Sequence, residues 1–301
     1  MLSFLPYTLK GIIAVSLLIL NTLIMSVPLF FFALLKLLIP VPICQKAMSH
    51  IVNNIAELWI TFNSAWMRLT QKLDYQIKGL ESFDSKGWYL VTANHQSWAD
   101  ITIMQHILNR KIPLMKFFLK RELIWVPVIG LCWWALDFPF VKRYSKSYLK
   151  AHPKKKHKNL EATSKACVKF KNTPISIVNY LEGTRFTKTK HQQQKSPFQH
   201  LLKPKSGGVG YVIGAMGDQI SSMINITISY NQPNIGYWNF LCGQIEQLSV
   251  HIEVITIPAE FSGKDYQNDS EFRRVFQLWI HTLWEAKDDR LRSMKKTSGI
   301  L

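Results

Sequence analysis

The chain has 301 residues, of which 48% are hydrophobic and only 19% are charged. That composition excludes a disordered protein, and the length suffices for one α/β domain with an extra segment at one end. The 37 lysines and arginines outnumber the 19 acidic residues and give a net charge of +18 at pH 7. We therefore expect an anionic partner, substrate or membrane surface, with nucleic acid, acidic lipid and phosphorylated metabolites all open.

At the N-terminus, no charged residue occurs between Lys10 and Lys36, and this stretch is long enough to cross a bilayer as a tilted helix. It is about twice as long as the apolar core of a cleaved signal peptide, and no small-x-small cleavage site follows it. We therefore expect a membrane segment. Pro28, Pro40 and Pro42 are expected to break it into shorter legs, which leaves a single span and a re-entrant hairpin both open.

A second helix is predicted over residues 48–72, where apolar side chains recur at helical spacing. Packing on a core and lodging in a membrane interface are equally compatible with this stripe, which consists of Ile51, Ile55, Leu58, Phe62, Trp66 and Leu69. Only Lys10 precedes the apolar segment, whereas several basic residues follow it, so the positive-inside bias places the rest of the chain in the cytoplasm. We assign residues 1–72 to a membrane anchor with its amphipathic helix, and residues 73–301 to an α/β domain.

After residue 72, short strand-like runs alternate with helical ones, which predicts a mixed, largely parallel sheet flanked by helices. Strands are expected over residues 75–78, 88–93, 138–141, 175–180, 223–230 and 249–257. Helices are expected over residues 98–109, 160–171, 207–216 and 271–286.

The most biased tract of the chain, residues 142–158, contains eight lysines or arginines and no acidic residue. A solvated loop has such a composition. An electrostatic tether has it too, because each basic residue near an anionic bilayer contributes roughly 1 kcal/mol.

The four cysteines, in contrast, show no paired spacing; they are Cys44, Cys132, Cys167 and Cys242. Their spacing suggests neither a zinc site nor a redox pair, so we expect reduced thiols and no metal.

The run Asn94-His95-Gln96-Ser97-Trp98-Ala99-Asp100 follows the predicted strand 88–93. This order places His95 in a loop, Ser97 at the helix N-cap and Asp100 in the first helical turn, pointing back toward the imidazole. A carboxylate there fixes the histidine tautomer, so that the other ring nitrogen can take a proton from an alcohol. Taken alone, the same residues are equally consistent with a helix cap and an incidental histidine, and the glycine-flanked turn of a nucleophilic serine is absent around Ser97.

Further residues lie near expected strand ends, where open α/β sheets bind their ligands. Gly183 allows a phosphate to approach the backbone, and Arg185 offers a planar fork for its oxygens. Lys205 precedes two glycines and a predicted helix start, where N–H groups can receive an anion. Arg143 follows the predicted strand 138–141. Each signal is weak alone, because ordinary turns with exposed charges give the same pattern.

In this order, these residues resemble the boxes of the glycerophospholipid acyltransferase family, whose best-known members are the 1-acyl-glycerol-3-phosphate acyltransferases. The Asn-His-x-x-x-x-Asp box matches residues 94–100, the Phe-x-x-Arg box matches 140–143, and the Glu-Gly-Thr-Arg box matches 182–185. Residues 203–208 look like the family's Lys-Pro-small-Gly turn. The family's last box usually has a proline between aliphatic residues, whereas this chain has Ile-Thr-Ile-Ser-Tyr at 226–230. The resemblance covers about half of the chain.

The resemblance implies a glycerol-3-phosphate acyltransferase-like fold and transfer of an acyl group from acyl-CoA or acyl carrier protein to a lysophospholipid, first of all lysophosphatidic acid. In this scheme His95 is the general base and Asp100 orients it. The substrate-binding residues that it implies are Arg143, Glu182, Gly183, Thr184, Arg185 and Lys205. No cofactor beyond the acyl donor and no nucleic acid is expected, and anionic membrane lipids are expected partners.

Residues 136–140 resemble a bacterial inner-membrane subgroup of the family, which implies an inner-membrane enzyme with its catalytic domain on the cytoplasmic side. Two alternatives remain. One is a lipid or thioester hydrolase that passes the acyl group to water. The other is a non-catalytic polybasic protein that binds membranes or nucleic acid, which would leave the ordered boxes unexplained.

Overall fold

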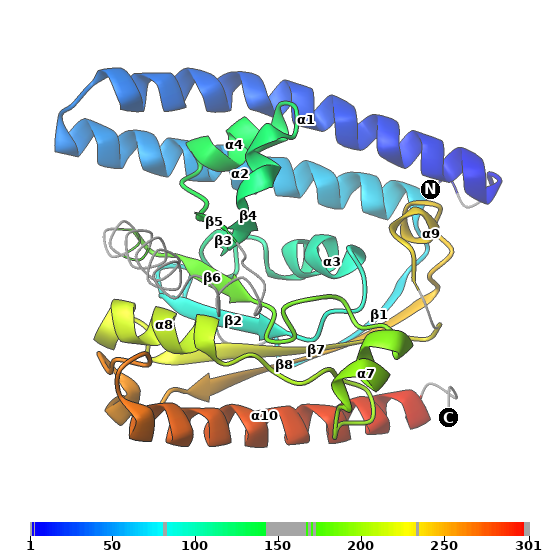
Figure 1. The fold of residues 1–301 in the computed structure, drawn as a ribbon. Coiled ribbons are helices and arrows are strands. Elements are labelled where there is room, and N and C mark those ends of the chain that lie inside the picture. Colours follow the sequence, from blue (N-terminus) through cyan, green and yellow to red (C-terminus); the bar gives the residue numbers. More distant parts are fainter. Residues whose placement is uncertain are drawn as a thin grey trace.

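The computed structural model describes residues 2, 4–80, 83–142, 167, 170, 173–232 and 235–297 (Figure 1). Arg143, most of the basic tract 142–158 and nearly all of the predicted helix 160–171 lie outside these residues.

Six strands form one mixed sheet in the order β1-β8-β7-β2-β6-β3, and neighbours run parallel except for the antiparallel pair β7 and β8. The strands are β1 (Asp74–Lys78), β2 (Tyr89–Ala93), β3 (Met115–Phe117), β6 (Ser176–Asn179), β7 (Ser222–Tyr230) and β8 (Gln247–Thr256). Two short strands, β4 (Leu119–Lys120) and β5 (Phe140–Val141), pair with each other. The predicted mixed, largely parallel sheet is confirmed.

Helices cover both faces of this sheet (Figure 1). On one face lies α3 (Ala99–Leu108), and beyond it α1 (Tyr7–Leu38) and α2 (Pro42–Thr70) run side by side as a long hairpin. The opposite face carries α8 (Gly207–Met216) and α10 (Ser270–Thr297). The remaining helical segments are η1 (Arg121–Trp125), α4 (Ile129–Ala135), α7 (Lys188–Gln194), η2 (Gly217–Gln219), α9 (Tyr237–Leu241) and η3 (Ala259–Phe261).

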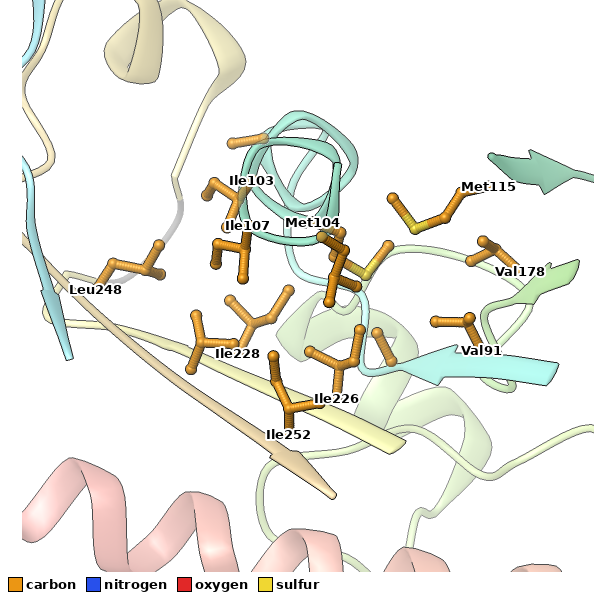
Figure 2. Packing of buried hydrophobic residues seen from close by; sticks show 14 of the residues in the cluster. Val91, Ile103, Met104, Ile107, Met115, Val178, Ile226, Ile228, Leu248 and Ile252 are labelled. Atoms are coloured by element: carbon orange, nitrogen blue, oxygen red, sulfur yellow. The ribbon is translucent and has the colours of Figure 1, made fainter. Parts of the chain in front are cut away.

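The core has one part on each side of the sheet. Between α3 and the sheet, Ile103 and Ile107 pack toward Ile226 and Ile228 of β7 (Figure 2). On the other side, Trp284 belongs to a cluster that joins α8 and α10 to the sheet. All five residues of β2 are buried, because helices cover both of its faces, and this explains its continuous apolar run. These two hydrophobic clusters pack on opposite faces of the strands whose ends carry the candidate site.

The helical hairpin corrects one sequence-based expectation. Helix α1 continues through Pro28 without a break, and the chain reverses at residues 39–41, beside Pro40. Pro42 lies in the first turn of α2, where its missing N–H removes no helical hydrogen bond. Packing of α1 along α2 offsets the one bond that Pro28 removes; Asn21, for example, donates to Asn63 Oδ1 at 2.8 Å.

Helix α2 buries a different face from the one that the spacing suggests. Of the predicted stripe, Trp66 is buried, whereas Leu58, Phe62 and Leu69 are exposed. Besides Trp66, the apolar residues of the helix that are buried are Val52, Ala56, Trp59, Ile60 and Met67. The helix therefore has apolar residues on two sides, and periodicity alone does not show which side the protein covers.

Candidate active site

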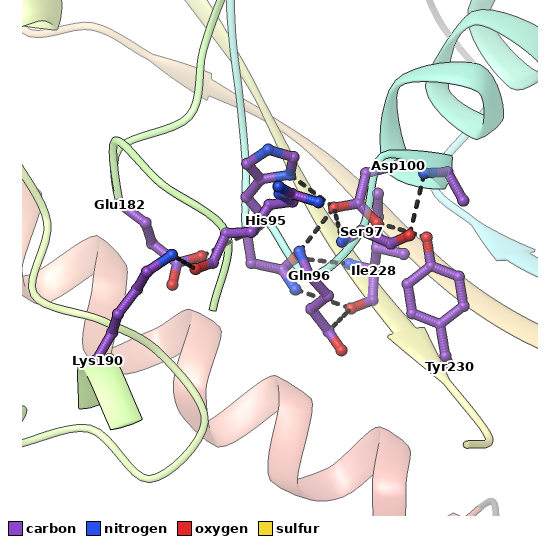
Figure 3. Close-up of polar contacts among 11 residues, drawn as sticks. His95, Gln96, Ser97, Asp100, Glu182, Lys190, Ile228 and Tyr230 are labelled. Atoms are coloured by element: carbon purple, nitrogen blue, oxygen red, sulfur yellow. Dashed lines mark hydrogen bonds and ion pairs between the residues drawn. The ribbon is translucent and has the colours of Figure 1, made fainter. Parts of the chain in front are cut away.

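His95 and Asp100 contact each other as the sequence predicts (Figure 3). His95 lies in the loop after β2, and Asp100 is the second residue of α3. Nδ1 of His95 lies 2.9 Å from Oδ2 of Asp100, and the Asp100 side chain is fully buried. Because a carboxylate only accepts, the neutral imidazole carries its proton on Nδ1 and keeps a lone pair on Nε2. Nε2 is the ring nitrogen left for a substrate.

The buried carboxylate of Asp100 is held by three further donors. Its Oδ2 accepts the backbone N–H groups of Gln96 at 2.7 Å and Ser97 at 2.9 Å, and its Oδ1 accepts the hydroxyl of Tyr230. A buried carboxylate needs such partners, because leaving it without them costs several kcal/mol. Helix α3 begins slightly later than expected, with Trp98 at the N-cap position. Ser97 still contributes, since its hydroxyl accepts the Ala99 N–H at 3.2 Å.

Two tyrosines flank the pair, one from the end of each strand that borders β2. Tyr180, which follows β6, stacks on the imidazole of His95 with ring centroids 4.0 Å apart. Tyr230 is the last residue of β7. Burial and the nearby charge of Asp100 raise the pKa of both phenols well above the usual value, so both stay protonated at neutral pH. The imidazole thus has an aromatic wall on one side and a fixed acceptor at Nδ1.

The loop that carries His95 is also pinned to β7. The side chain of Asn94 donates to the carbonyl of Ile228 at 2.9 Å and accepts the N–H of the same residue at 2.8 Å. Gln96 Nε2 donates to that carbonyl as well, at 2.8 Å. Residues 226–230, which depart from the family's usual last box, therefore supply both a backbone anchor for this loop and the Tyr230 hydroxyl.

Glu182 joins two loops from the inside of the protein. Its side chain is fully buried; Oε1 accepts the His95 N–H at 2.7 Å and Oε2 accepts the Leu202 N–H at 2.9 Å. Burial raises its pKa to about 7. Fully buried Lys287 of α10 lies nearby and donates to the Ile226 carbonyl, and burial lowers its pKa to about 7. In this arrangement Glu182 positions the His95 loop and presents no free oxygen to solvent.

Gly183 and Lys205 lie against each other. Gly183 has φ +66°, a conformation that favours glycine, and a Cβ there would come within 2.9 Å of the Lys205 ammonium nitrogen. The Lys205 N–H donates to the Leu181 carbonyl at 2.7 Å, which fixes the approach of the two loops. The glycine that the sequence singles out is therefore needed for its backbone conformation, whereas the flexible end of the Lys205 side chain could move away from a Cβ.

Arg185 lies beside the candidate pair. Its exposed guanidinium is 5.0 Å above the ring of Trp98, which belongs to the same loop as His95. Lys190 of α7 donates to Thr184 Oγ1 at 2.8 Å and to the Arg185 carbonyl at 3.0 Å. The structure thus brings together all the predicted site residues that it describes, at the carboxyl ends of β2 and β6.

The sequence gives no direct indication of three residues that hold this site, Tyr180, Tyr230 and Lys287. Tyr180 and Tyr230 are 80 and 130 residues beyond Asp100 in the chain. Their positions at predicted strand ends are the only available signal. Lys287 lies in a helix whose pattern predicts core packing, and nothing in that pattern marks a buried lysine.

Comparisons with known proteins point to acyltransferases. Residues 74–220 match the family model described as Acyltransferase. The 1-acyl-sn-glycerol-3-phosphate acyltransferase gamma of Mus musculus is 24% identical over 196 residues, which cover 62% of this chain and 46% of that protein. Lysocardiolipin acyltransferase 1 of Mus musculus is 23% identical over 259 residues, which cover 81% of this chain and 63% of that protein. The chain spans about half the length of the 1-acyl-sn-glycerol-3-phosphate acyltransferases that it matches.

A solved structure has the same fold. The crystal structure of the 1-acyl-sn-glycerophosphate (LPA) acyltransferase PlsC from Thermotoga maritima superposes with a TM-score of 0.52 at 15% identity. The match covers 91% of this chain and 94% of that one. The likeness to this structure shows the fold alone. The match of residues 74–220 to the Acyltransferase model and the curated relatives support the glycerophospholipid acyltransferase family, whose boxes the sequence carries in order.

Proposed function

We propose that this protein transfers a fatty acyl group from a thioester donor, acyl-CoA or acyl carrier protein, to the free hydroxyl of a lysophospholipid, with lysophosphatidic acid as the first candidate acceptor. The contact between His95 and Asp100 carries the proposal. It supports the proposal because it leaves Nε2 available to accept a proton at the carboxyl end of β2, in a loop whose Trp98 contacts the exposed Arg185, and because residues 74–220 match an acyltransferase family model.

In the proposed reaction, Nε2 of His95 accepts the proton of the acceptor hydroxyl while that oxygen attacks the thioester carbonyl. The new C–O bond forms, the C–S bond breaks, and the imidazolium returns the proton to the leaving thiolate. Asp100 keeps the ring oriented and stabilises its positive charge. Direct alignment of alcohol and thioester can supply about 7 to 11 kcal/mol of the barrier reduction, so no covalent acyl-enzyme is required.

The acceptor's phosphate is assigned to Arg185, whose planar fork matches phosphate oxygens. Gly183 and Thr184 shape the same loop, and Lys205 lies over Gly183. Arg143 belongs to the proposal through its sequence box alone, because it lies outside the described residues. Glu182 supports the site from behind.

Residues 1–72 are proposed to anchor residues 73–301 to a bacterial inner membrane, with the α/β domain on the cytoplasmic side. Among the described residues, α1 is the one helix that is long and apolar enough to cross a membrane. Its surface exposes large apolar side chains, among them Val27, Phe31 and Leu37, and α2 adds Leu58 and Phe62. Large apolar side chains exposed in this number on two long helices favour contact with lipid.

The test is acyl transfer by the purified protein from labelled oleoyl-CoA to a panel of lysophospholipids, compared with His95→Ala. We expect product with the wild type and none with the variant, while both bind vesicles equally. His50→Ala, at an exposed position of α2, is the matched control and should keep full activity. Turnover retained by His95→Ala would remove the assigned base. Release of free fatty acid without an acceptor would favour a hydrolase, and vesicle binding without any turnover would favour the non-catalytic alternative.

A further inference from the structure

Lys190 is a cation of the candidate site that lies outside all of the sequence boxes. It belongs to α7, five residues after Arg185, and reaches toward the backbone beside Glu182 and His95 (Figure 3). Its ammonium donates to Thr184 Oγ1 at 2.8 Å and to the Arg185 carbonyl at 3.0 Å. Because an ammonium has three N–H donors, these two hydrogen bonds leave one donor for a ligand.

Helix α7 holds Lys190 in a fixed place. Its N-cap residue Thr187 accepts the backbone N–H of Lys190 at 3.2 Å. In the middle of the helix, Nε2 of His191 lies 2.6 Å from the carbonyl of Phe198 in the following loop. The ammonium is therefore positioned before a ligand arrives, which lowers the cost of ordering this side chain on binding.

The loop that Lys190 contacts also holds His95. The Phe186 N–H donates to the His95 carbonyl at 2.7 Å, and the His95 N–H donates to Glu182 Oε1 at 2.7 Å, so residues 182–186 hold the backbone of His95 on both sides. In a 1-acyl-glycerol phosphate, the free hydroxyl is on the carbon next to the one that carries the phosphate. Groups that bind this phosphate must therefore lie close to Nε2 of His95. Lys190 meets this requirement because it contacts the loop that holds the histidine.

No carboxylate neutralises the charge of Lys190. Within the described part of the chain, neither Lys190 nor Arg185 forms an ion pair. The one acidic residue of their loop, Glu182, uses one oxygen for the His95 N–H and the other for the Leu202 N–H. The site thus presents two positive charges to a ligand, one as a planar fork and one as a point charge.

Two cations distinguish between the two classes of phosphate that lysophospholipids carry. A phosphate monoester has a second pKa of about 6 and carries about 1.5 to 2 negative charges at pH 7. A phosphate diester, whose phosphorus also carries a headgroup alcohol, has no second proton to release and keeps a single negative charge. The second cation of the site is therefore matched by a monoester and left unmatched by a diester.

We propose that Lys190 is a specificity-determining residue of this site, which together with Arg185 selects lysophospholipids whose phosphate is a monoester. The inference rests on the proposed acyl transfer and names its acceptor class. Lys190 binds the phosphate through its third N–H donor, and its other two donors hold Thr184 and the Arg185 backbone in place.

The first experiment measures kcat/KM for lysophosphatidic acid, a monoester, and for lysophosphatidylglycerol, a diester, with labelled oleoyl-CoA. For Lys190→Met we expect the preference for the monoester to fall about tenfold, because the diester gains little from the second positive charge. Lys190→Arg keeps the charge and the donors and should keep most of the preference. Lys188→Met makes the same charge change at an exposed position of α7 and should behave like the wild type.

Two results of this experiment would overturn the proposal. Equal losses for both acceptors in Lys190→Met would mean that Lys190 only holds the loop. An equal loss of preference in Lys188→Met would reduce the effect to general electrostatics.

The second readout is the pH dependence of the same preference. Between about pH 5 and pH 7 the monoester gains its second negative charge, whereas the charge of the diester stays constant. The preference of the wild type should therefore rise over this range, and that of Lys190→Met should rise by a smaller factor. Ionisation of His95, Glu182 and His191 is common to both acceptors and cancels in the ratio. An equal rise in the two proteins would contradict the proposal.

Binding without turnover separates this inference from the proposed function. Hexanoyl lysophosphatidic acid, a short-chain monoester, is titrated by calorimetry into His95→Ala protein, with and without Lys190→Met. We expect saturable binding that weakens about tenfold in the double variant. That result, with a wild type that transfers no acyl group from any donor, would keep the phosphate site and reject the proposed function. Acyl transfer by the wild type, together with equal binding by the two variants, would overturn the inference and leave the proposed function standing.

Discussion

Asp100 shows at the scale of one residue how this site is built. Its two oxygens accept from the imidazole, from two backbone N–H groups and from the Tyr230 hydroxyl, so the carboxylate has no freedom to turn. The imidazole is held in one orientation as well, because Asp100 contacts its Nδ1 and Tyr180 stacks on its face. In the proposed reaction, proton transfer at Nε2 therefore depends on the residues that hold Asp100 and His95 in place.

Tyr230→Phe tests this dependence, because it removes the phenol's hydrogen bond to Asp100 and keeps the ring. A hydrogen bond to a charged group contributes about 1.5 to 3 kcal/mol, so we expect kcat to fall on the order of tenfold or more. The KM for the acceptor should stay unchanged, since Tyr230 positions Asp100 and does not bind lipid. Tyr237→Phe, which removes a hydroxyl that contacts Thr102, is the control. Equal kcat values for both variants would contradict the role of Tyr230.

Arg185→Lys tests the phosphate assignment at the same scale. Lysine keeps the charge and loses the bidentate fork, so the KM for the phosphorylated acceptor should rise about tenfold while kcat changes little. Steady-state kinetics at saturating donor measure both constants. Arg274→Lys, at an exposed position of α10, provides the same change away from the site and should have no effect. An unchanged KM for Arg185→Lys would mean that the phosphate binds elsewhere.

At the scale of elements, the sequence predicts what local pattern controls and misses what tertiary contact controls. All six predicted strands are present, while β3 and β4 are too short, at three and two residues, to give a pattern. The His95 to Asp100 contact is predictable because five residues span a strand end and a helix start. Tyr230 is not, because only the pairing of β7 with β2 brings its hydroxyl to Asp100. Pro28 signals a break that packing along α2 overrides.

Helix α10 lies beyond the residues that the family model matches, yet it holds the site from behind. Asp288 accepts the N–H groups of Gln199 and His200, both at 2.7 Å, and Trp284 Nε1 donates to the Leu202 carbonyl at 3.0 Å. Lys287, between them in sequence, is buried close to Glu182. The helix therefore fixes the loop that Glu182 joins to His95.

Lys287→Met tests the role of this buried lysine through the pH dependence of protein stability. Burial lowers the pKa of Lys287 to about 7 from its usual 10.5, so between these values the unfolded chain binds more protons than the folded protein. The free energy of unfolding of the wild type therefore rises with pH between pH 7 and pH 10.5, and Lys287 contributes at most about 1.4 kcal/mol per pH unit to this rise. We expect the wild type to gain stability relative to Lys287→Met from pH 7 to pH 10 in urea unfolding. Lys296→Met, on the exposed side of α10, should follow the wild type; a parallel curve for Lys287→Met would contradict the assignment.

At the scale of the whole molecule, the two faces of the sheet differ in chemistry. The α1–α2 hairpin exposes large apolar side chains along its length, whereas the opposite face carries the amphipathic helix α10. The proposed membrane anchoring predicts this asymmetry. The His95 loop lies between the two faces, at the carboxyl end of the central strand β2.

Val27→Lys and Leu278→Lys test that asymmetry as a matched pair. Both residues are exposed apolar positions on long helices, with 69% and 61% of their surfaces accessible, but Val27 is on α1 and Leu278 on α10. A lysine placed in the hydrocarbon region costs about 2.5 to 3.5 kcal/mol, so Val27→Lys should weaken binding to anionic vesicles by at least about tenfold. Leu278→Lys should bind like the wild type, because its face meets water. Vesicle flotation with both variants, after circular dichroism has confirmed equal helix content, separates the cases. Equal binding by the two variants would mean that the hairpin does not face the membrane.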